Sequence, residues 1–318
     1  MRSAFIKTLV ELAERDETIW LLTGDLGYSV LEVFAARFPH RYVNVGVAEQ
    51  NMTGIAAGLA MSGLTVFTYS IANFSTIRCL EQIRNDVCYH NLNVNIVAVG
   101  GGVAYGSAGY THHALEDLAV MRAMPNLSVV APGDPIEVRL ATRTLAESSG
   151  PSYLRLGRGG EAVVHQGEPD FRLGTAIALR EGGDVTLIST GGMLRTVVAV
   201  ADILSDEGIA ARVLSMHTVK PLDTAAVRAA ATNTGLLAVV EDHSDVGGLY
   251  SAITSALGAH PTPCLSFAFS RSTEGRIGSQ EHLTKLAGLT PPDIAAAVAG
   301  RLRSEPCPSA QRSGSQEP

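Results

Sequence analysis

Apolar runs of strand character alternate with segments of helical spacing along most of the chain. In the first half, the strand-like runs fall at residues 19–23, 42–45, 64–69, 94–99, 127–130 and 152–156. The segments with helical spacing are 3–15, 30–37, 48–62, 73–89, 115–122 and 135–147. Strands that alternate with helices in this way form mostly parallel sheets that helices cover on both faces. The sequence therefore predicts an α/β fold built from doubly wound domains.

A second unit of the same kind follows a looser stretch of the chain. Between residues 158 and 183, glycines surround short strand-like pieces, which is typical of a domain linker. Beyond it, strands are predicted at 185–190, 210–215, 236–240 and 265–269, with helices at 194–205, 224–233 and 249–257. We thus predict a first domain over 1–157, a linker over 158–183 and a smaller domain over 184–302. Residues 303–318, rich in Ser, Pro, Gln and Gly, are predicted to form a disordered tail.

The composition limits the kinds of partner. Hydrophobic residues make up 46% of the 318 residues and charged residues only 17%, which suits buried parallel sheets and a large subunit interface. The net charge is -7 and no basic stripe is present, so nucleic-acid and anionic membrane surfaces are both disfavoured. No stretch approaches ~18 uninterrupted apolar residues, and the N-terminus lacks an apolar run of signal-peptide length. We expect a cytoplasmic protein that binds small molecules and another protein chain.

Cysteine and glycine spacing argues against several further kinds of site. Cys79, Cys88, Cys264 and Cys307 show no Cys-x-x-Cys or His/Cys ligand spacing, which disfavours zinc and a disulfide framework and fits a reducing compartment. The chain contains neither Gly-x-Gly-x-x-Gly nor Gly-x-x-x-x-Gly-Lys-Ser/Thr, so nucleotide binding through those motifs is disfavoured. We expect no metal ligands in this chain.

Residues 42–60 carry the clearest chemical signal. Glu49 lies where a short strand gives way to a helix of small and apolar residues, with Val47, Ala48 and Met52 beside it. A carboxyl group in such apolar surroundings is suited to sharing a proton with a ring nitrogen. Alternatively, Glu49 only fills the first turn of the helix, where the helix dipole favours a negative charge. The spacing alone leaves both readings open.

Residues 46–52, Gly-Val-Ala-Glu-Gln-Asn-Met, resemble the Gly-Val-x-Glu-x-x-Met signature of the pyrimidine-binding domain in transketolases and 1-deoxyxylulose-5-phosphate synthases. In that family the glutamate hydrogen-bonds to the N1′ atom of the aminopyrimidine of thiamine diphosphate. The resemblance implies that Glu49 is catalytic and binds this cofactor. It also implies that Met52 belongs to the cofactor-binding residues.

The segment after this signature, residues 69–86, resembles the part of the family in which aromatic rings pack on the aminopyrimidine. The resemblance implies that Phe74 contacts the cofactor. It also implies that Ile71 offers apolar packing where many members carry a second aromatic ring. On composition alone, a phenylalanine in the protein core is the alternative.

Two histidines and two arginines are the candidate substrate ligands. Residues 110–119 resemble the Thr-His-Gln-x-x-Glu-x-x-Ala segment of transketolases, which implies that His112 is catalytic and that His113 lies near the substrate. A histidine is suited to moving a proton on a sugar hydroxyl near neutral pH. Arg2 and Arg158 match family arginines that hold a donor phosphate, for which a planar guanidinium is suited. The alternative for each arginine is an ordinary surface residue.

One family motif is not matched. Gly24-Asp25-Leu26 resembles only the start of the Gly-Asp-Gly motif that binds Mg2+ and the diphosphate in thiamine enzymes, because Leu26 stands in place of the second glycine. In full transketolases that motif belongs to a separate N-terminal domain. The resemblance therefore implies that a separate alpha chain binds Mg2+ and the diphosphate, and that this chain is the beta subunit of a split transketolase, in an alpha2beta2 heterotetramer. Such an enzyme transfers a two-carbon ketol unit from a ketose, expected to be phosphorylated, to an aldehyde. The alternatives are the beta chain of a 2-oxo acid dehydrogenase and a catalytically silent scaffold subunit.

Two positions near the expected substrate site also depart from the family. Ala108 stands where the usual enzymes have an aspartate that reads a donor hydroxyl, and Gly100 replaces a histidine that helps to bind the donor. A site that loses such polar groups relaxes or redirects its choice of substrate. The sequence therefore predicts an altered donor preference.

Overall fold

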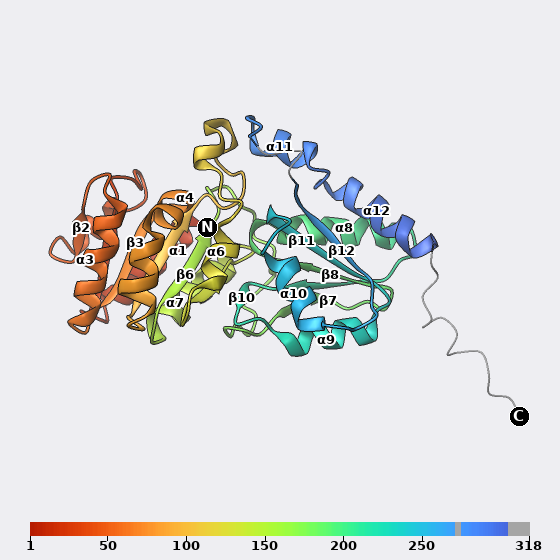
Figure 1. Ribbon diagram of the computed structural model, residues 1–318, viewed down its shortest axis with the longest axis horizontal. Helices are drawn as coiled ribbons and strands as arrows, with labels where there is room; N and C mark the ends of the chain where they lie inside the picture. Colours follow the sequence, from red (N-terminus) through yellow and green to blue (C-terminus); the bar gives the residue numbers. More distant parts are fainter. Residues whose placement is uncertain (271–274, 305–318) are drawn as a thin grey trace, which may run out of the picture.

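The computed structural model describes residues 1–270 and 275–304, which form two α/β units lying side by side (Figure 1). The strands of the first unit are β1 (Ile19–Thr23), β2 (Tyr42–Asn44), β3 (Thr65–Ile71), β4 (Val94–Val99), β5 (Ser128–Val130) and β6 (Ser152–Leu156). Its helices include α1 (Arg2–Ala13), α2 (Glu32–Arg37), α3 (Glu49–Met61), α4 (Ala72–Ser75), α5 (Leu80–Gln82), α6 (Asp117–Ala123) and α7 (Pro135–Glu147). Five strands, β7 (Ile177–Arg180), β8 (Val185–Ser189), β9 (Ala211–Ser215), β11 (Leu237–Ser244) and β12 (Cys264–Phe269), form the sheet of the second unit. Its helices include α8 (Leu194–Asp206), α9 (Thr224–Asn233), α10 (Leu249–Leu257), α11 (Gln280–Leu286) and α12 (Pro291–Ser304).

Both sheets are mostly parallel. The second sheet has the strand order β12-β11-β8-β9-β7, and its edge strand β7 runs antiparallel to β9. The first sheet has the order β10-β5-β6-β4-β3-β1-β2, in which β10 (Thr218–Lys220) comes from the second half of the chain and runs antiparallel to β5. The predicted α/β class with two doubly wound domains is confirmed.

The central strands are buried on both faces of the sheet, and this explains why their sequences are apolar runs without alternation. Every residue of β4 is buried, as are the first six residues of β3, because helices cover both faces of a parallel sheet. One buried apolar cluster contains Ile96 of β4 together with Leu214 of β9 and Val239 of β11. The two units therefore share part of their core.

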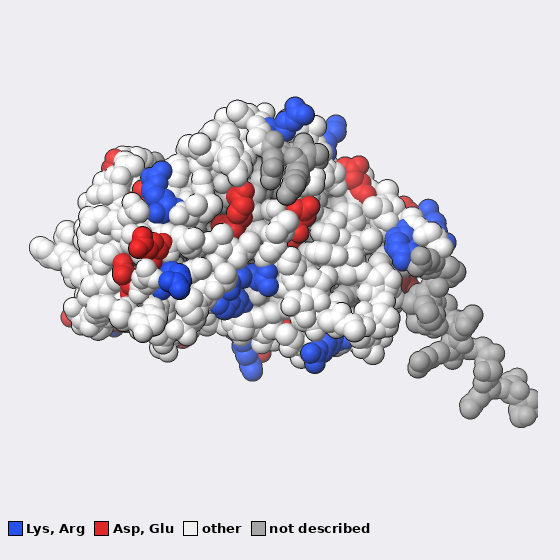
Figure 2. Space-filling model, viewed as in Figure 1, with Lys and Arg blue, Asp and Glu red and all other residues white. Residues whose placement is uncertain are grey.

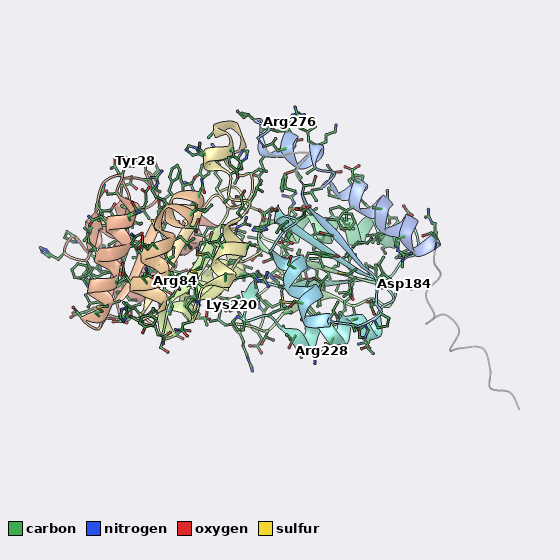
Figure 3. All side chains as sticks on the ribbon, in the orientation of Figure 1. Tyr28, Arg84, Asp184, Lys220, Arg228 and Arg276 are labelled. Carbon is green, nitrogen blue, oxygen red and sulfur yellow. The ribbon has the colours of Figure 1, made fainter. Side chains whose placement is uncertain are left out.

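A buried ionic network also fixes one unit against the other. Arg155, on β6, donates from Nε to Asp117 Oδ2 of α6 at 2.7 Å and from Nη2 to the Asp242 carbonyl oxygen of β11 at 3.0 Å. The Tyr153 hydroxyl donates to the same Asp117 oxygen at 2.6 Å. Lys220, labelled in Figure 3 where the units meet, donates from Nζ to the Arg122 carbonyl oxygen at 3.1 Å. These contacts fix the carboxyl end of β6 relative to the second unit.

The predicted helix over 73–89 is wrong in its continuity. The structure divides this stretch into α4, a 3-10 turn at Ile77–Cys79, α5 and a π-helix at Ile83–Cys88. The Thr76 hydroxyl donates to the Ala72 carbonyl oxygen at 2.6 Å, and the Ser75 hydroxyl donates to the Ile71 carbonyl oxygen. Such hydroxyl-to-carbonyl bonds compete with the regular helical pattern, and this accounts for the early break.

Other boundaries also differ from those predicted. The segment 158–183, predicted as a linker, contains strand β7, and the short strand β10 was not predicted at all. Helices α11 and α12 were not predicted either, and α12 continues through Ser304, so Arg303 and Ser304 are helical. The remainder of the predicted tail, 305–318, lies outside the described residues.

The helices and one face of the molecule show two further features. No helix in the described ranges is both long and apolar enough to cross a membrane. On the described part of the face in Figure 2, lysines and arginines are scattered among acidic residues and form no continuous basic stripe.

Candidate active site

Glu49 is the first residue of α3, at the junction that follows β2. Gly46 adopts a φ of +73, which lets the chain turn from the strand into the helix. The Glu49 side chain is only 1% exposed. Its Oε2 accepts a hydrogen bond from Arg78 Nη1 at 2.8 Å, and its Oε1 lies 3.4 Å from the donating Ser70 hydroxyl. A carboxylate is thus buried and held at the start of a helix.

Gly24, at the end of β1, packs against this carboxylate side chain. A Cβ atom at Gly24 would lie 3.3 Å from Glu49 Cγ, which is tighter than an ordinary contact, and 3.5 Å from Glu49 Oε1. Asp25 bonds instead to Asn44, whose Nδ2 donates to Asp25 Oδ1 at 3.0 Å. Gly24 therefore leaves room for the Glu49 side chain, and Asp25 is bonded to the end of β2.

An aromatic and cationic group lies beside Glu49. Arg78 Cζ lies 4.5 Å from the centroid of the Phe74 ring, and the Phe74 and His112 rings meet edge to face with centroids 5.1 Å apart. Asn73 Nδ2 donates to the Thr111 carbonyl oxygen at 2.7 Å, which fixes the two segments relative to each other. The Thr111 hydroxyl lies 3.0 Å from His112 Nδ1, so the Nε2 atom is the ring nitrogen left for other contacts.

The row of side chains continues toward the end of β6. The Tyr105 ring lies 6.5 Å from the His112 ring, and Arg158 Cζ lies 5.5 Å from the Tyr105 centroid. Arg158 also lines a cavity of about 210 Å³ between the two units, whose walls include Gly157, Gly191 and Asp242. Side-chain contacts thus connect Glu49 with Phe74, His112 and Arg158 in one row.

Arg2 reaches the same region from the N-terminus. Its Nη2 lies 3.3 Å from where a Cβ atom at Gly159 would be. Its buried Nε and the buried Tyr69 hydroxyl have no well-formed hydrogen bond among the described residues. Burial raises the pKa of Tyr69, and the nearby positive charge of Arg2 opposes this rise. The Arg2 side chain and the buried Tyr69 side chain therefore lie next to each other at this end of the row.

The other predicted site residues are placed differently. Met52 is 1% exposed and belongs to the hydrophobic core under α3, whereas Ile71 is half-buried at the end of β3. His113 is 3% exposed, and its Nε2 lies 3.3 Å from the Gly106 carbonyl oxygen. The structure therefore turns His113 inward, away from the side on which His112 contacts Phe74.

Arg78 and Tyr105 are site residues to which no role was assigned from the sequence. Arg78 follows Phe74 by four residues, a spacing that places two side chains on one helix face. Tyr105 follows the carboxyl end of β4, the edge at which parallel sheets bind ligands. The spacing of Phe74 and Arg78 could have identified Arg78 from the sequence, whereas the place of Tyr105 after a strand marks only a loop that can line a site.

The residues around Glu49 fit an aminopyrimidine ring. The Glu49 carboxylate is buried, its partner Arg78 lies over the Phe74 ring, and Gly24 presents no side chain to it. Within residues 1–270 and 275–304, no group of three or more His, Cys, Asp or Glu residues is placed to hold a metal ion. The chain thus offers contacts for the ring of a cofactor.

Comparison with known proteins agrees with this geometry. The family models for the transketolase pyrimidine binding domain and the transketolase C-terminal domain match residues 1–160 and 174–294. The chain is 41% identical to one subunit of the apulose-4-phosphate transketolase from Phocaeicola vulgatus, over 82% of this chain and 85% of that protein. It is 37% identical to a subunit of the 6-deoxy-6-sulfo-D-fructose transketolase from a Clostridium species, over 94% and 93%. A solved structure described as a split gene transketolase in an inactive beta4 tetramer is 39% identical, with a TM-score of 0.86 over 95% of this chain and 97% of that one. This chain therefore belongs to the transketolase family.

Proposed function

We propose that the chain is the beta subunit of a two-component transketolase. The enzyme transfers a two-carbon ketol unit from a ketose that carries a terminal anion, in the first instance a phosphate, to an aldehyde acceptor. The observation that carries the proposal is the buried Glu49 carboxylate beside Phe74, with His112 5.1 Å from the Phe74 ring. A proton-sharing acid, an aromatic face and a histidine are the groups that this reaction requires from the protein.

Bound thiamine diphosphate supplies the nucleophilic carbon that takes up the ketol unit. Glu49 holds a proton at the N1′ atom of the aminopyrimidine, and the surrounding core keeps water away from that carboxyl group. Phe74 and Ile71 pack against the ring, and Met52 supports them from the core. The chain's own contribution is therefore to orient the ring and to hold its proton.

The substrate lies on the side of His112 and Arg158. His112 moves a proton at a hydroxyl of the ketose, with its free ring nitrogen as the acid or base. Arg158 and Arg2 hold the terminal anion, since guanidinium groups make paired hydrogen bonds to phosphate oxygens. His113 is the weakest of the proposed ligands, because its ring contacts the Gly106 carbonyl oxygen.

A separate alpha chain completes the enzyme in this proposal. That chain binds Mg2+ and the diphosphate, and two copies of each chain form an alpha2beta2 heterotetramer. The names of the relatives support this arrangement, because two of them are transketolase subunits and one solved relative is an inactive assembly of beta chains. These names also favour ketol transfer over the oxidative decarboxylation of a 2-oxo acid and over a silent scaffold.

The test is reconstitution with a chain that carries the diphosphate-binding half of a transketolase, taken first from a neighbouring gene. The mixture is supplied with thiamine diphosphate, Mg2+, a panel of ketose phosphates and aldehydes, and separately with 2-oxo acids. We expect ketol transfer only when both chains are present. Oxidative decarboxylation without ketol transfer would favour the 2-oxo acid dehydrogenase, and no activity with any panel member would favour the scaffold.

A binding measurement tests whether a separate alpha chain holds the charged end of the cofactor. The purified chain alone is expected to bind thiamine diphosphate and Mg2+ far more weakly than the two-chain complex, because the charged end of the cofactor then lacks its ligands. Micromolar binding by the isolated chain would contradict the proposed alpha subunit.

A further inference from the structure

We propose that Tyr105 is the specificity-determining residue of this site. Its hydroxyl hydrogen-bonds to a hydroxyl of an extended sugar whose terminal anion is held by Arg158. The inference rests on the proposed ketol transfer and extends it to the choice of substrate.

Tyr105 fills space that a side chain at residue 100 would otherwise occupy. Gly100 follows β4 with a φ of +86, and a Cβ atom there would lie 2.1 Å from Cε2 of the Tyr105 ring. Such a separation is far below any real contact, so residue 100 must be glycine while Tyr105 holds this position. The resemblance to transketolases implies that the usual family members carry a histidine where this chain has Gly100. Here a phenol from five residues further along the chain stands in that place.

The Tyr105 ring lies near both residues that are proposed to act on the ends of the substrate. It lies 6.5 Å from His112, which moves the proton, and 5.5 Å from Arg158 Cζ, which holds the anion. In this proposal, a sugar that extends from one to the other lies against Tyr105. The contact with the ring also restricts the position of the guanidinium, because a cation is attracted to an aromatic face.

The Tyr105 hydroxyl is available to a ligand. The side chain is half-buried, and the hydroxyl makes no hydrogen bond to any residue that the structure describes. A half-buried tyrosine usually finds a partner for its hydroxyl. Ala108 has no polar side chain, whereas the Tyr105 ring lies near both His112 and Arg158.

These contacts define the substrate class by its chemistry. It is an extended sugar with a phosphate or a similar terminal anion and a hydroxyl on a carbon between that anion and the reacting carbonyl. The face of the Tyr105 ring packs against the C–H groups of the sugar, and the phenol hydroxyl hydrogen-bonds to the sugar hydroxyl. Discrimination of this kind is strong, because the analogue without the hydroxyl leaves a buried polar group unpaired.

The test compares Tyr105→Phe and Tyr105→Ala in the reconstituted complex, with Tyr89→Phe as a matched control on an exposed tyrosine. The substrates are xylulose 5-phosphate, fructose 6-phosphate and the 4-deoxy analogue of each. We expect Tyr105→Phe to lower kcat/KM for the preferred donor by about tenfold, mainly through KM, since one neutral hydrogen bond is lost. The same substitution should also lower the ratio of kcat/KM for the parent sugar to kcat/KM for its deoxy analogue, because the variant no longer hydrogen-bonds to the hydroxyl that the analogue lacks.

Tyr105→Ala is expected to shift the order of preference within the panel, because the ring face is lost as well. Tyr105→Phe keeps the ring, so it remains informative if the alanine variant does not fold. The proposal is overturned if both variants retain the wild-type ratio between parent and deoxy sugars, or if Tyr89→Phe changes that ratio as much as Tyr105→Phe does.

A binding measurement separates this inference from the proposed function. If the wild-type complex transfers no ketol unit, the proposed function is wrong. The role of Tyr105 is then tested by measuring dissociation constants for fructose 6-phosphate and for inorganic phosphate. Weaker binding of the sugar phosphate by Tyr105→Phe, with unchanged binding of inorganic phosphate, supports its role. Equal affinities in wild type and variant, or no sugar-phosphate binding by the wild type, overturn it.

Discussion

Arg78 donates a hydrogen bond to the buried carboxylate of Glu49 at 2.8 Å while its guanidinium lies 4.5 Å over the Phe74 ring. The two partners differ in exposure, since the Arg78 side chain is 45% exposed and that of Glu49 only 1%. A buried carboxylate without a partner is costly, and Arg78 removes that cost from the solvent side.

The first prediction concerns the stability of this pair. Arg78→Ala is expected to lower the free energy of unfolding by about 1 kcal/mol, less than for a fully buried pair because the guanidinium is partly solvated. In a Glu49→Gln background the same substitution should cost less, since no carboxylate remains to be compensated. Urea denaturation of the four proteins measures the coupling.

The control for this cycle is Arg84→Ala. Arg84, labelled in Figure 3, is an exposed arginine in the neighbouring π-helix, and its Nη1 donates to Asn85 Oδ1. Its removal should cost the same with Glu49 or Gln at position 49. An equal cost of Arg78→Ala in both backgrounds would show that the pair is not coupled.

The second prediction concerns activity. Glu49→Gln is nearly isosteric, so the fold should remain, while the acid that holds the ring proton is lost. Turnover of the reconstituted complex is expected to fall by at least about a hundredfold, as for other losses of a general acid or base. Glu17→Gln, at an exposed loop position, is the matched control and should retain turnover. Wild-type turnover by Glu49→Gln would remove the proposed role of Glu49.

The third prediction separates two adjacent histidines. His112→Gln is expected to lower kcat by about a hundredfold or more with little change in stability, because His112 lies in the row of site residues. His113→Gln should instead lower the free energy of unfolding by about 1 to 2 kcal/mol, since its buried ring contacts the Gly106 carbonyl oxygen. Thermal unfolding and steady-state kinetics on both variants decide the matter. A larger kcat loss for His113→Gln than for His112→Gln would reverse these roles.

Local patterns predicted the parts of the molecule that depend on neighbouring residues in the chain. The transition from strand to helix at Glu49 follows from a β-branched run and the small residues after it, and the structure has that transition. The two sheets could also be predicted, because buried parallel strands need unbroken apolar runs.

Contacts between distant segments were not predictable in the same way. Strand β10 lies in the second half of the chain but pairs with β5 of the first unit, and no local pattern specifies such a partner. Gly100 and Tyr105 could be read from the sequence only as a loop glycine and a loop aromatic, because their close packing depends on the path of the whole loop. Which of His112 and His113 faces inward likewise depends on the contact with Gly106.

The fourth prediction concerns pH and the segment between the two units. His165 Nε2 lies 2.8 Å from Glu137 Oε1 of α7, and the backbone N–H groups of Val164 and His165 donate to Asp134 Oδ2. Burial opposes the charged form of His165, but the hydrogen bond and the charge of Glu137, aided by Asp134, raise the pKa of His165 overall. Nearby, burial lowers the pKa of His217, whose ring stacks on Phe171 at 4.0 Å.

The sign of the pH dependence follows from the raised pKa of His165. A histidine whose pKa is higher in the folded than in the unfolded state stabilises the fold fully below its ordinary pKa of about 6.5, and this contribution is lost as pH rises through the folded value. The difference in free energy of unfolding between wild type and His165→Gln should therefore be largest near about pH 6 and smaller near about pH 9. His217 is present in both proteins, so its opposite dependence largely cancels. Urea denaturation across this range provides the measurement, with exposed His40→Gln as the control. A difference that stays constant, or that grows with pH, would show that the charged pair with Glu137 does not stabilise this segment.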